Sequence, residues 1–131
     1  MKGFLYASKF MKDYNGLTEV LTDRKLASLG DAYVNFVYSL LLSIRRGQPS
    51  GKKAKGAVLA DALRKAGLRE CMPSRMTNHD LADAAEALIV YAWLSNQVPL
   101  EETVATLQET DELRDGFVRL LKKAKDRVML S

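Results

Sequence analysis

Two stretches of this chain are apolar on nearly every side of a helix, and each carries carboxylates inside the apolar run. The first extends from Leu26 to Ile44 and contains Asp31. The second extends from Leu81 to Leu94 and contains Asp83 and Glu86. A helix that is apolar all round belongs in the interior of a protein. We therefore expect two central, neighbouring helices, with carboxylates between them that are costly to bury unless something compensates for the lost water.

The patterning of the remaining chain is helical as well, and no segment alternates for long as a strand would. We expect an all-α fold of about six helices in a single compact domain, residues 1–131. Asp23 or Thr22 can cap the first central helix, and Thr77 or Asn78 the second. The expected helices are Leu5 to Tyr14, about Asp23 to Arg46, about Lys55 to Ala66, Asn78 to about Ser95, one that starts at Pro99, and about Asp111 to Met129.

Small residues lie on the faces that the two central helices are expected to share. Gly30 and Ala27 are on the Asp31 side of the first helix, and alanines line the second. A glycine inside a helix costs about 1 kcal/mol relative to alanine. We therefore expect Gly30 to allow close approach of the two helices, or of two subunits, which would offset this cost.

The spacing of the carboxylates suggests a metal site. Asp83 and Glu86 are three residues apart and share a helix face. If the central helices pack side by side, Asp31 converges on the same point. Three carboxylates without a cation would repel one another and raise their own pKa values, and Mg²⁺ or Mn²⁺ would remove that conflict. Such an ion can activate water and neutralise charge on a phosphodiester.

Other arrangements of these residues remain open from spacing alone. Asp83 can pair with Arg75 or His79, and Glu86 can lie at the edge of the bundle. His79 can also orient a carboxylate, or serve only as a capping or solvent-facing residue. Asn35, one turn after Asp31, can hold a metal-bound water or satisfy a buried carbonyl.

Composition limits the classes of protein to consider. Of 131 residues, 47% are hydrophobic and 27% charged, which is ordinary for a soluble domain. The longest apolar run, Ala32 to Ile44, is interrupted by polar residues and is too short for a bilayer, so no membrane partner is expected. Cys71 is alone, which excludes a disulfide framework and a cysteine zinc site. With no secretory signal, we expect a cytoplasmic location.

The basic residues gather in clusters on either side of an acidic central region. The net charge is +4, and the segment from Arg45 to Lys55 contains no acid. Such clusters suit a polyanion whose phosphates meet a metal, although solvated loop charges give the same pattern. The basic residues in this Gly-, Pro- and Ser-containing segment are Arg45, Arg46, Lys52, Lys53 and Lys55.

Two motifs together resemble the ribonuclease III family. Leu26-Ala-Ser-Leu-Gly-Asp-Ala-Tyr-Val-Asn35 is similar to that family's signature helix, L-E-F-L-G-D-A-V-L-N. Leu81-Ala-Asp-Ala-Ala-Glu-Ala-Leu-Ile89 is similar to its second acidic motif, A-D-x-F-E-A-L-I-G. The resemblance implies a helical endonuclease domain that forms homodimers, binds Mg²⁺ and cleaves double-stranded RNA. By motif alignment, the family's metal-binding, catalytic carboxylates fall on Asp31, Asp83 and Glu86.

The resemblance departs from the family pattern at Ala27, where the signature helix normally has a second glutamate. No segment of the sequence resembles a double-stranded RNA-binding domain, so this is expected to be a short form. RNA affinity is then expected from the core itself or from a separate RNA-binding protein. Because double-stranded RNA is recognised mostly through phosphates and 2′-hydroxyls, the basic residues from Arg45 to Lys55 are the candidate RNA contacts.

The sequence therefore predicts a metal-dependent endoribonuclease, a hydrolase that leaves 5′-phosphate and 3′-hydroxyl ends on structured RNA. Two alternatives stand beside it. One is a catalytically inactive RNA-binding or ribosome-associated protein of the same fold, which Ala27 motivates. The other is a helical homodimeric interaction protein whose carboxylates make contacts between chains.

Overall fold

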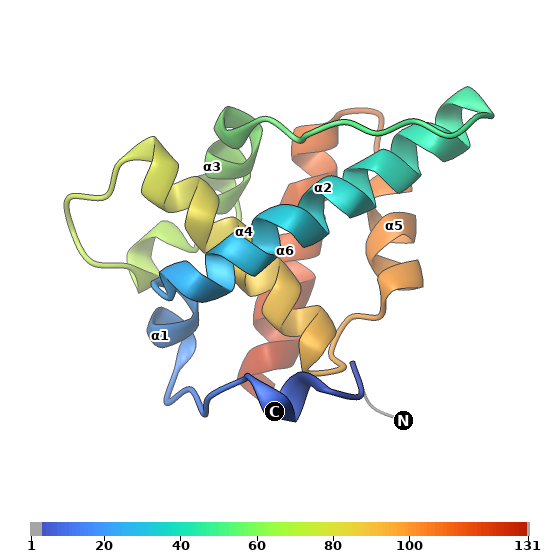
Figure 1. Ribbon diagram of the computed structural model, residues 1–131. Helices are drawn as coiled ribbons and strands as arrows, with labels where there is room; N and C mark the ends of the chain where they lie inside the picture. The colour runs from blue at the N-terminus through green and yellow to red at the C-terminus, as the bar shows by residue number, and fades with distance from the viewer. Residues whose placement is uncertain (1–3, 131) are drawn as a thin grey trace.

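The computed structural model describes residues 4–130, and all regular structure in that range is helical (Figure 1). This confirms the expected all-α fold class. Two short 3-10 turns, η1 (Ala7–Lys9) and η2 (Arg69–Cys71), accompany the α-helices. The helices are α1 (Leu17–Leu21), α2 (Arg24–Arg46), α3 (Gly56–Lys65), α4 (Asn78–Leu94), α5 (Leu100–Gln108) and α6 (Leu113–Leu130).

Helix α4 is the centre of the fold. It packs along α2 on one side and contacts α1, α3 and α6 on others, and Figure 1 shows α2 crossing it. Burial is nearly complete along its length, with Ala84, Leu88 and Val90 each at 0% exposed. Helix α5 packs mainly against α2 and α6. The two apolar stretches of the sequence are therefore neighbours in the core, as their composition predicts.

Gly30 is the point of closest approach between α2 and α4. A Cβ atom added at this residue would lie 2.2 Å from the backbone oxygen of Glu86 and 2.5 Å from its carbonyl carbon. Contacts this short do not occur between real Cβ atoms and their neighbours. Only glycine fits here, so the close helix approach expected from a glycine inside a helix is confirmed. The contact also sets Asp31, the next residue of α2, beside Glu86 of α4.

Side-chain caps set where the two central helices begin. Asp23 Oδ1 accepts hydrogen bonds from the backbone amides of Lys25 (3.0 Å) and Leu26 (3.1 Å). Thr77 and Asp80 form a capping box, in which each side chain accepts from the other residue's amide. These interactions satisfy amides that the first turn of a helix leaves without partners. Asp23 and Thr77 are among the caps expected from the sequence.

The helix expected from Leu5 to Tyr14 is wrong. The chain forms only the turn η1 there, and the short helix α1 follows where the sequence analysis placed none. Contacts with distant parts of the chain hold this segment instead. The Phe4 ring packs against Trp93, with centroids 5.5 Å apart, and the Tyr14 hydroxyl donates to Asp23 Oδ2 at 2.6 Å. Tertiary packing of aromatic rings has overridden the local helical pattern.

Helix α2 has one face in the core and an apolar outer face. By length and composition it meets the criterion for a membrane-crossing helix, with a mean hydropathy of 1.2, but a core helix meets the same criterion. Val34 and Leu41 are at 0% exposed in the core. Leu29, Phe36 and Ile44, in contrast, are 41%, 54% and 55% exposed. One chain alone therefore leaves a row of large apolar side chains on α2 uncovered.

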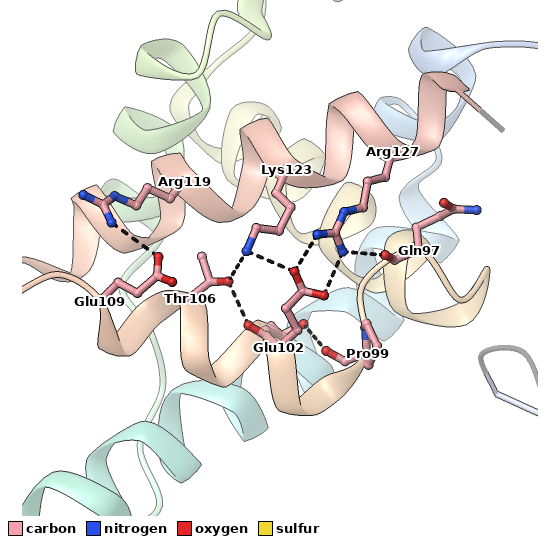
Figure 2. A network of polar contacts seen from close by, with 9 residues as sticks. Gln97, Pro99, Glu102, Thr106, Glu109, Arg119, Lys123 and Arg127 are labelled. Atoms are coloured by element: carbon pink, nitrogen blue, oxygen red, sulfur yellow. Dashed lines mark hydrogen bonds and ion pairs between the residues drawn. The ribbon is translucent and has the colours of Figure 1, made fainter.

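A network of ion pairs joins α5 to α6 (Figure 2). Arg127 holds Glu102 with two hydrogen bonds, at 2.8 and 2.6 Å, and also donates to the carbonyl of Gln97. Lys123 Nζ lies 3.1 Å from the same carboxylate and 2.8 Å from the Thr106 hydroxyl. The hydrogen bond from Arg127 is the main cause that lowers the pKa of Glu102 to about 2. Lys123 and Arg127, two basic residues of α6, therefore fasten this helix to α5.

Candidate active site

Glu86 is the one carboxylate among the described residues that is buried, with 6% of its surface exposed. It is buried because it lies midway along the central helix α4, against Gly30 of α2. Within the described residues, no Lys, Arg or His forms an ion pair with it. Burial raises the pKa of Glu86 to about 8, and a hydrogen bond with Asp31 and the charges of Asp31 and Asp83 act in the same direction. At neutral pH Glu86 thus retains its proton.

Asp31 and Asp83 line one pocket together with Glu86. The pocket has a volume of about 350 Å³ and opens between α2 and α4. The three carboxylates differ in exposure to solvent, since Asp31 is exposed, Asp83 is half-buried and Glu86 is buried. The residues that line it are Arg24, Ala27, Ser28, Asp31, Ala54, Gly56, His79, Ala82, Asp83 and Glu86. The structure therefore brings together the three carboxylates that the sequence analysis selected, while their catalytic role stays a prediction.

His79 lies closest to Asp83. Its Nε2 atom is 3.5 Å from Asp83 Oδ2, one helical turn along α4, and the imidazole is largely exposed. This is one of the pairings that the sequence left open for Asp83. It orients the Asp83 carboxylate at the mouth of the pocket and gives it a partner that Glu86 does not have.

The donor set suits a Mg²⁺ ion bound through two carboxylates. Among the described residues, no group of three or more His, Cys, Asp or Glu side chains is arranged to hold a metal ion between them. The hydrogen bond and the negative charge of Asp31 nevertheless raise the pKa of Glu86, and a divalent cation would remove this conflict between the two carboxylates. Mg²⁺ commonly uses one or two protein carboxylates and fills its remaining positions with water and phosphate oxygens. Asp31 and Glu86 are therefore the residues that would hold the ion.

Asn35 connects Asp31 to the loop that follows α2. Its Nδ2 atom donates to Asp31 Oδ1 at 3.2 Å, and its Oδ1 atom accepts from the backbone amide of Ala54 at 2.8 Å. Both functions of the carboxamide are therefore in use. The side chain therefore binds an amide rather than the carbonyl that the sequence left open for it, while its role in holding a metal-bound water stays a prediction.

The comparison with protein families places this site in context. A family model described as Ribonuclease III matches residues 24–128, from the start of α2 into the end of α6. The chain belongs to the ribonuclease III family. A comparison with curated proteins gave no match. Family membership supports a ribonuclease-related function, and ribonuclease III proteins in general use a divalent metal.

For a ribonuclease III protein, this site has an alanine where the family's signature helix has a second glutamate. Ala27 lines the carboxylate pocket and also an adjoining, largely apolar pocket of about 220 Å³. Asp83 and Arg24 line both pockets as well. Where the family's glutamate would stand, the wall of the carboxylate pocket is therefore the methyl group of Ala27, and Arg24 lies next to it.

Arg24 is a residue of the site that the sequence analysis missed. Its guanidinium is exposed and pairs with Asp80 at 3.2 Å, across from the start of α4. The signal was present in the sequence, because Arg24, Ala27 and Asp31 are three and four residues apart and share a face of α2.

The predicted RNA contacts fall into two groups in the structure. Arg45 donates to the carbonyls of Thr110 (2.9 Å) and Leu107 (3.4 Å), where α5 ends, and Arg46 donates to the Ser50 hydroxyl at 2.9 Å. Both guanidinium groups thus serve the fold. The exposed lysines 52, 53 and 55 lie in the loop that leads to the pocket. RNA binding by these five residues stays a prediction, and the lysines are the freer candidates.

Proposed function

We propose that this chain is a divalent-metal-dependent endoribonuclease that cleaves double-stranded or structured RNA to 5′-phosphate and 3′-hydroxyl ends. The observation that carries this proposal is the buried Glu86 carboxyl, which shares a pocket with Asp31 and Asp83 and has no basic partner among the described residues. A buried acid in this position weakens the fold at neutral pH. Its presence is accounted for if the site is completed by a cation.

Each residue of the pocket has a role in this proposal. Asp31 and Glu86 would hold Mg²⁺ or Mn²⁺, with Glu86 ionised, and Asp83 would supply the third carboxylate beside the ion. When bound, the ion lowers the pKa of a water molecule and offsets negative charge on the phosphodiester. Asn35 orients Asp31 through its amide group, and His79 orients Asp83. Arg24 and the lysines of the loop attract the RNA backbone.

A cleavage assay tests the proposal. A long RNA duplex, single-stranded RNA and a DNA duplex are incubated with the protein in Mg²⁺, Mn²⁺ or EDTA. We expect metal-dependent cutting of the RNA duplex that Asp83→Ala abolishes. Asp126→Asn, which changes an exposed carboxylate on α6, is the control and is expected to cut as the unaltered protein does. Cutting by Asp83→Ala at the unaltered rate would contradict the proposal.

A second candidate function is RNA binding without catalysis, as in a ribosome-associated protein. Ala27 favours it, because the pocket has one carboxylate fewer than the family's motif, and no three-ligand group is preformed in the described chain. Titration with Mn²⁺ in the presence of RNA separates the two candidates. A protein that binds RNA tightly and takes up no Mn²⁺ cannot carry out metal-dependent hydrolysis.

The exposed face of α2 supports a homodimer. Leu29 and Phe36 are exposed on this helix, and Leu29 lines a hollow of about 860 Å³ together with Phe10. A two-fold pairing would cover these side chains and present two cutting centres to one duplex. Phe36→Glu is expected to shift the protein from dimer to monomer in sedimentation analysis. A dimer that bound no RNA in a salt-dependent manner would instead favour a pure interaction protein.

A further inference from the structure

The loop after α2 is held against that helix by a ladder of side chains. Residues 50–55, which we call the strap, run back along α2 towards α3, and Figure 1 shows this path. Three polar residues of α2 at four-residue spacing accept hydrogen bonds from every second amide of the strap. The pairs are Ser50 N to Ser43 Oγ (2.9 Å), Lys52 N to Ser39 Oγ (2.9 Å) and Ala54 N to Asn35 Oδ1 (2.8 Å).

The two serines also donate to the strap. The Ser39 hydroxyl lies 3.0 Å from the carbonyl oxygen of Lys52, and the Ser43 hydroxyl lies 3.2 Å from that of Ser50. Each hydroxyl has one proton, which it can direct either to the strap or to the carbonyl one turn earlier in α2. The ladder thus binds the amides of Ser50, Lys52 and Ala54, and its serine hydroxyls also reach the carbonyls of Ser50 and Lys52. Apolar residues at positions 43 and 35 would leave the half-buried amides of Ser50 and Ala54 without partners.

The opposite edge of the strap faces away from α2. In an extended chain, successive residues point to opposite sides. The amides of Gly51 and Lys53 form no hydrogen bond within the described residues, whereas those of their neighbours are bound to α2. Lys52, Lys53 and Lys55 are all exposed. The strap is therefore an exposed cationic strip, with backbone donors on the edge away from α2 and lysine side chains on both of its faces.

This strip ends at the carboxylate pocket. Ala54 and Gly56 line the pocket, and Asn35 binds the amide of Ala54 and the carboxylate of Asp31 at the same time. The positions of the lysines and of Asp31 are therefore linked through one carboxamide. Three residues of extended chain span about 10 Å, so Lys52 and Lys55 are placed to contact different phosphates.

We propose that the strap is a preformed strip for the phosphate backbone of RNA, and that Asn35, Ser39 and Ser43 are the positioning residues that hold it beside the carboxylate pocket. This inference rests on the proposed function, because it assigns the RNA contact of the same site. A strap already fixed on α2 loses less conformational entropy when it binds phosphate than a free loop would. The ladder thus contributes to RNA affinity without touching RNA.

Binding of a short RNA duplex in EDTA, at several salt concentrations, tests this inference without cleavage. The main variant is Ser39→Ala combined with Ser43→Ala. The matched control is Ser95→Ala, since that hydroxyl donates to the Tyr91 carbonyl at the other end of α4. We expect the ladder variant to bind RNA about tenfold more weakly, with faster hydrogen exchange at the amides of Ser50 and Lys52. Ser39→Thr combined with Ser43→Thr keeps both hydroxyls and is expected to restore binding.

A second comparison separates positioning from general stability. In a protein that carries Gln at positions 52, 53 and 55, the strap has no ammonium groups to position. The ladder variant is then expected to cost almost no further affinity, so the effects of ladder and lysines are not additive. If the double serine variant does not fold, the single variants Ser39→Ala and Ser43→Ala replace it, because each removes one of the hydrogen bonds to the strap.

The outcomes distinguish this inference from the proposed function. If the unaltered protein binds RNA and the ladder variant binds equally well, the strap is not the phosphate-binding strip and the inference is wrong, while the proposed function stands. If the losses from ladder and lysine changes simply add, the ladder acts on stability alone and the inference is also wrong. If the unaltered protein binds no RNA at any salt concentration, both the inference and the proposed function are overturned.

Discussion

Gly30→Ala is the substitution whose effect follows most directly from the structure. The added Cβ atom would lie 2.2 Å from the Glu86 backbone oxygen, whereas ordinary contacts begin at about 3.4 Å. Helices α2 and α4 would have to separate locally by about 1 Å, because the atom in the way is backbone and cannot rotate aside. Overpacking of this kind costs about 1–3 kcal/mol or more, against a gain of about 1 kcal/mol in helix propensity. We expect a net loss of about 2 kcal/mol in the free energy of unfolding.

Urea unfolding followed by circular dichroism measures this change. The control is Gly56→Ala at the start of α3, where a Cβ atom would lie 3.8 Å from the Ala82 Cβ, an ordinary contact. That variant is expected to unfold at the same urea concentration or a slightly higher one. Because the Gly30 contact also sets Glu86 beside Asp31, Gly30→Ala is expected to lose RNA cleavage under conditions in which it is still folded.

The result that would refute this reasoning is simple to recognise. If Gly30→Ala were as stable as the unaltered protein, or more stable through its helix propensity, α2 and α4 would not be in backbone contact at this point. The placement of Asp31 against Glu86 would then need another cause.

Three further predictions concern the buried Glu86, the ion pairs of Glu102 and the cap at Thr77. Glu86→Gln should stabilise the metal-free protein increasingly as pH rises, because the raised pKa of Glu86 favours the folded state fully below 4.5, the value in the unfolded chain, and this contribution is lost as pH approaches about 8. In urea unfolding with EDTA, the difference in free energy of unfolding between variant and unaltered protein should grow by about 3–5 kcal/mol over this pH range, and a constant difference would contradict the assignment. Glu102→Gln should cost about 1–2 kcal/mol at pH 7 after solvent screening, and the loss should vanish as pH falls from 4.5 towards about 2, since a lowered pKa stabilises only above it; thermal melts across this range check it. Thr77→Ala should lower the free energy of unfolding by about 1 kcal/mol through loss of the capping box, and equal melting temperatures for the two proteins would count against that cap.

Much of the fold was predictable because its main helices carry strong local signals. The apolar runs of α2 and α4 predict central helices, and Asp23 and Thr77 have the side chains that cap them. The region before Leu17 was not predictable in this way. Its aromatic residues have a helical pattern, but besides contacts with one another they pack against rings more than seventy residues away, such as Phe4 with Trp93 and Tyr14 with Tyr91.

The candidate site was predictable in part. Spacing on two helices was sufficient to select Asp31, Asp83 and Glu86, because residues three and four apart share a face. Spacing does not show how deep each carboxylate lies or what pairs with it. The burial of Glu86, the pairing of Asp83 with His79 and the presence of Arg24 at the pocket depend on how α2 and α4 pack.

The sequence by itself determined that this chain is helical, that α2 and α4 are its central helices, and that carboxylates lie inside their apolar runs. These are local properties, since they depend on periodicity and on caps within one or two turns. Only the tertiary structure decided that the close approach at Gly30 brings Glu86 beside Asp31. It also decided that Arg45 donates to the carbonyl of Thr110 after α5, and that Asn35 binds the strap next to the pocket. These depend on contacts between distant segments, where packing and hydrogen-bond satisfaction, rather than local pattern, set which groups meet.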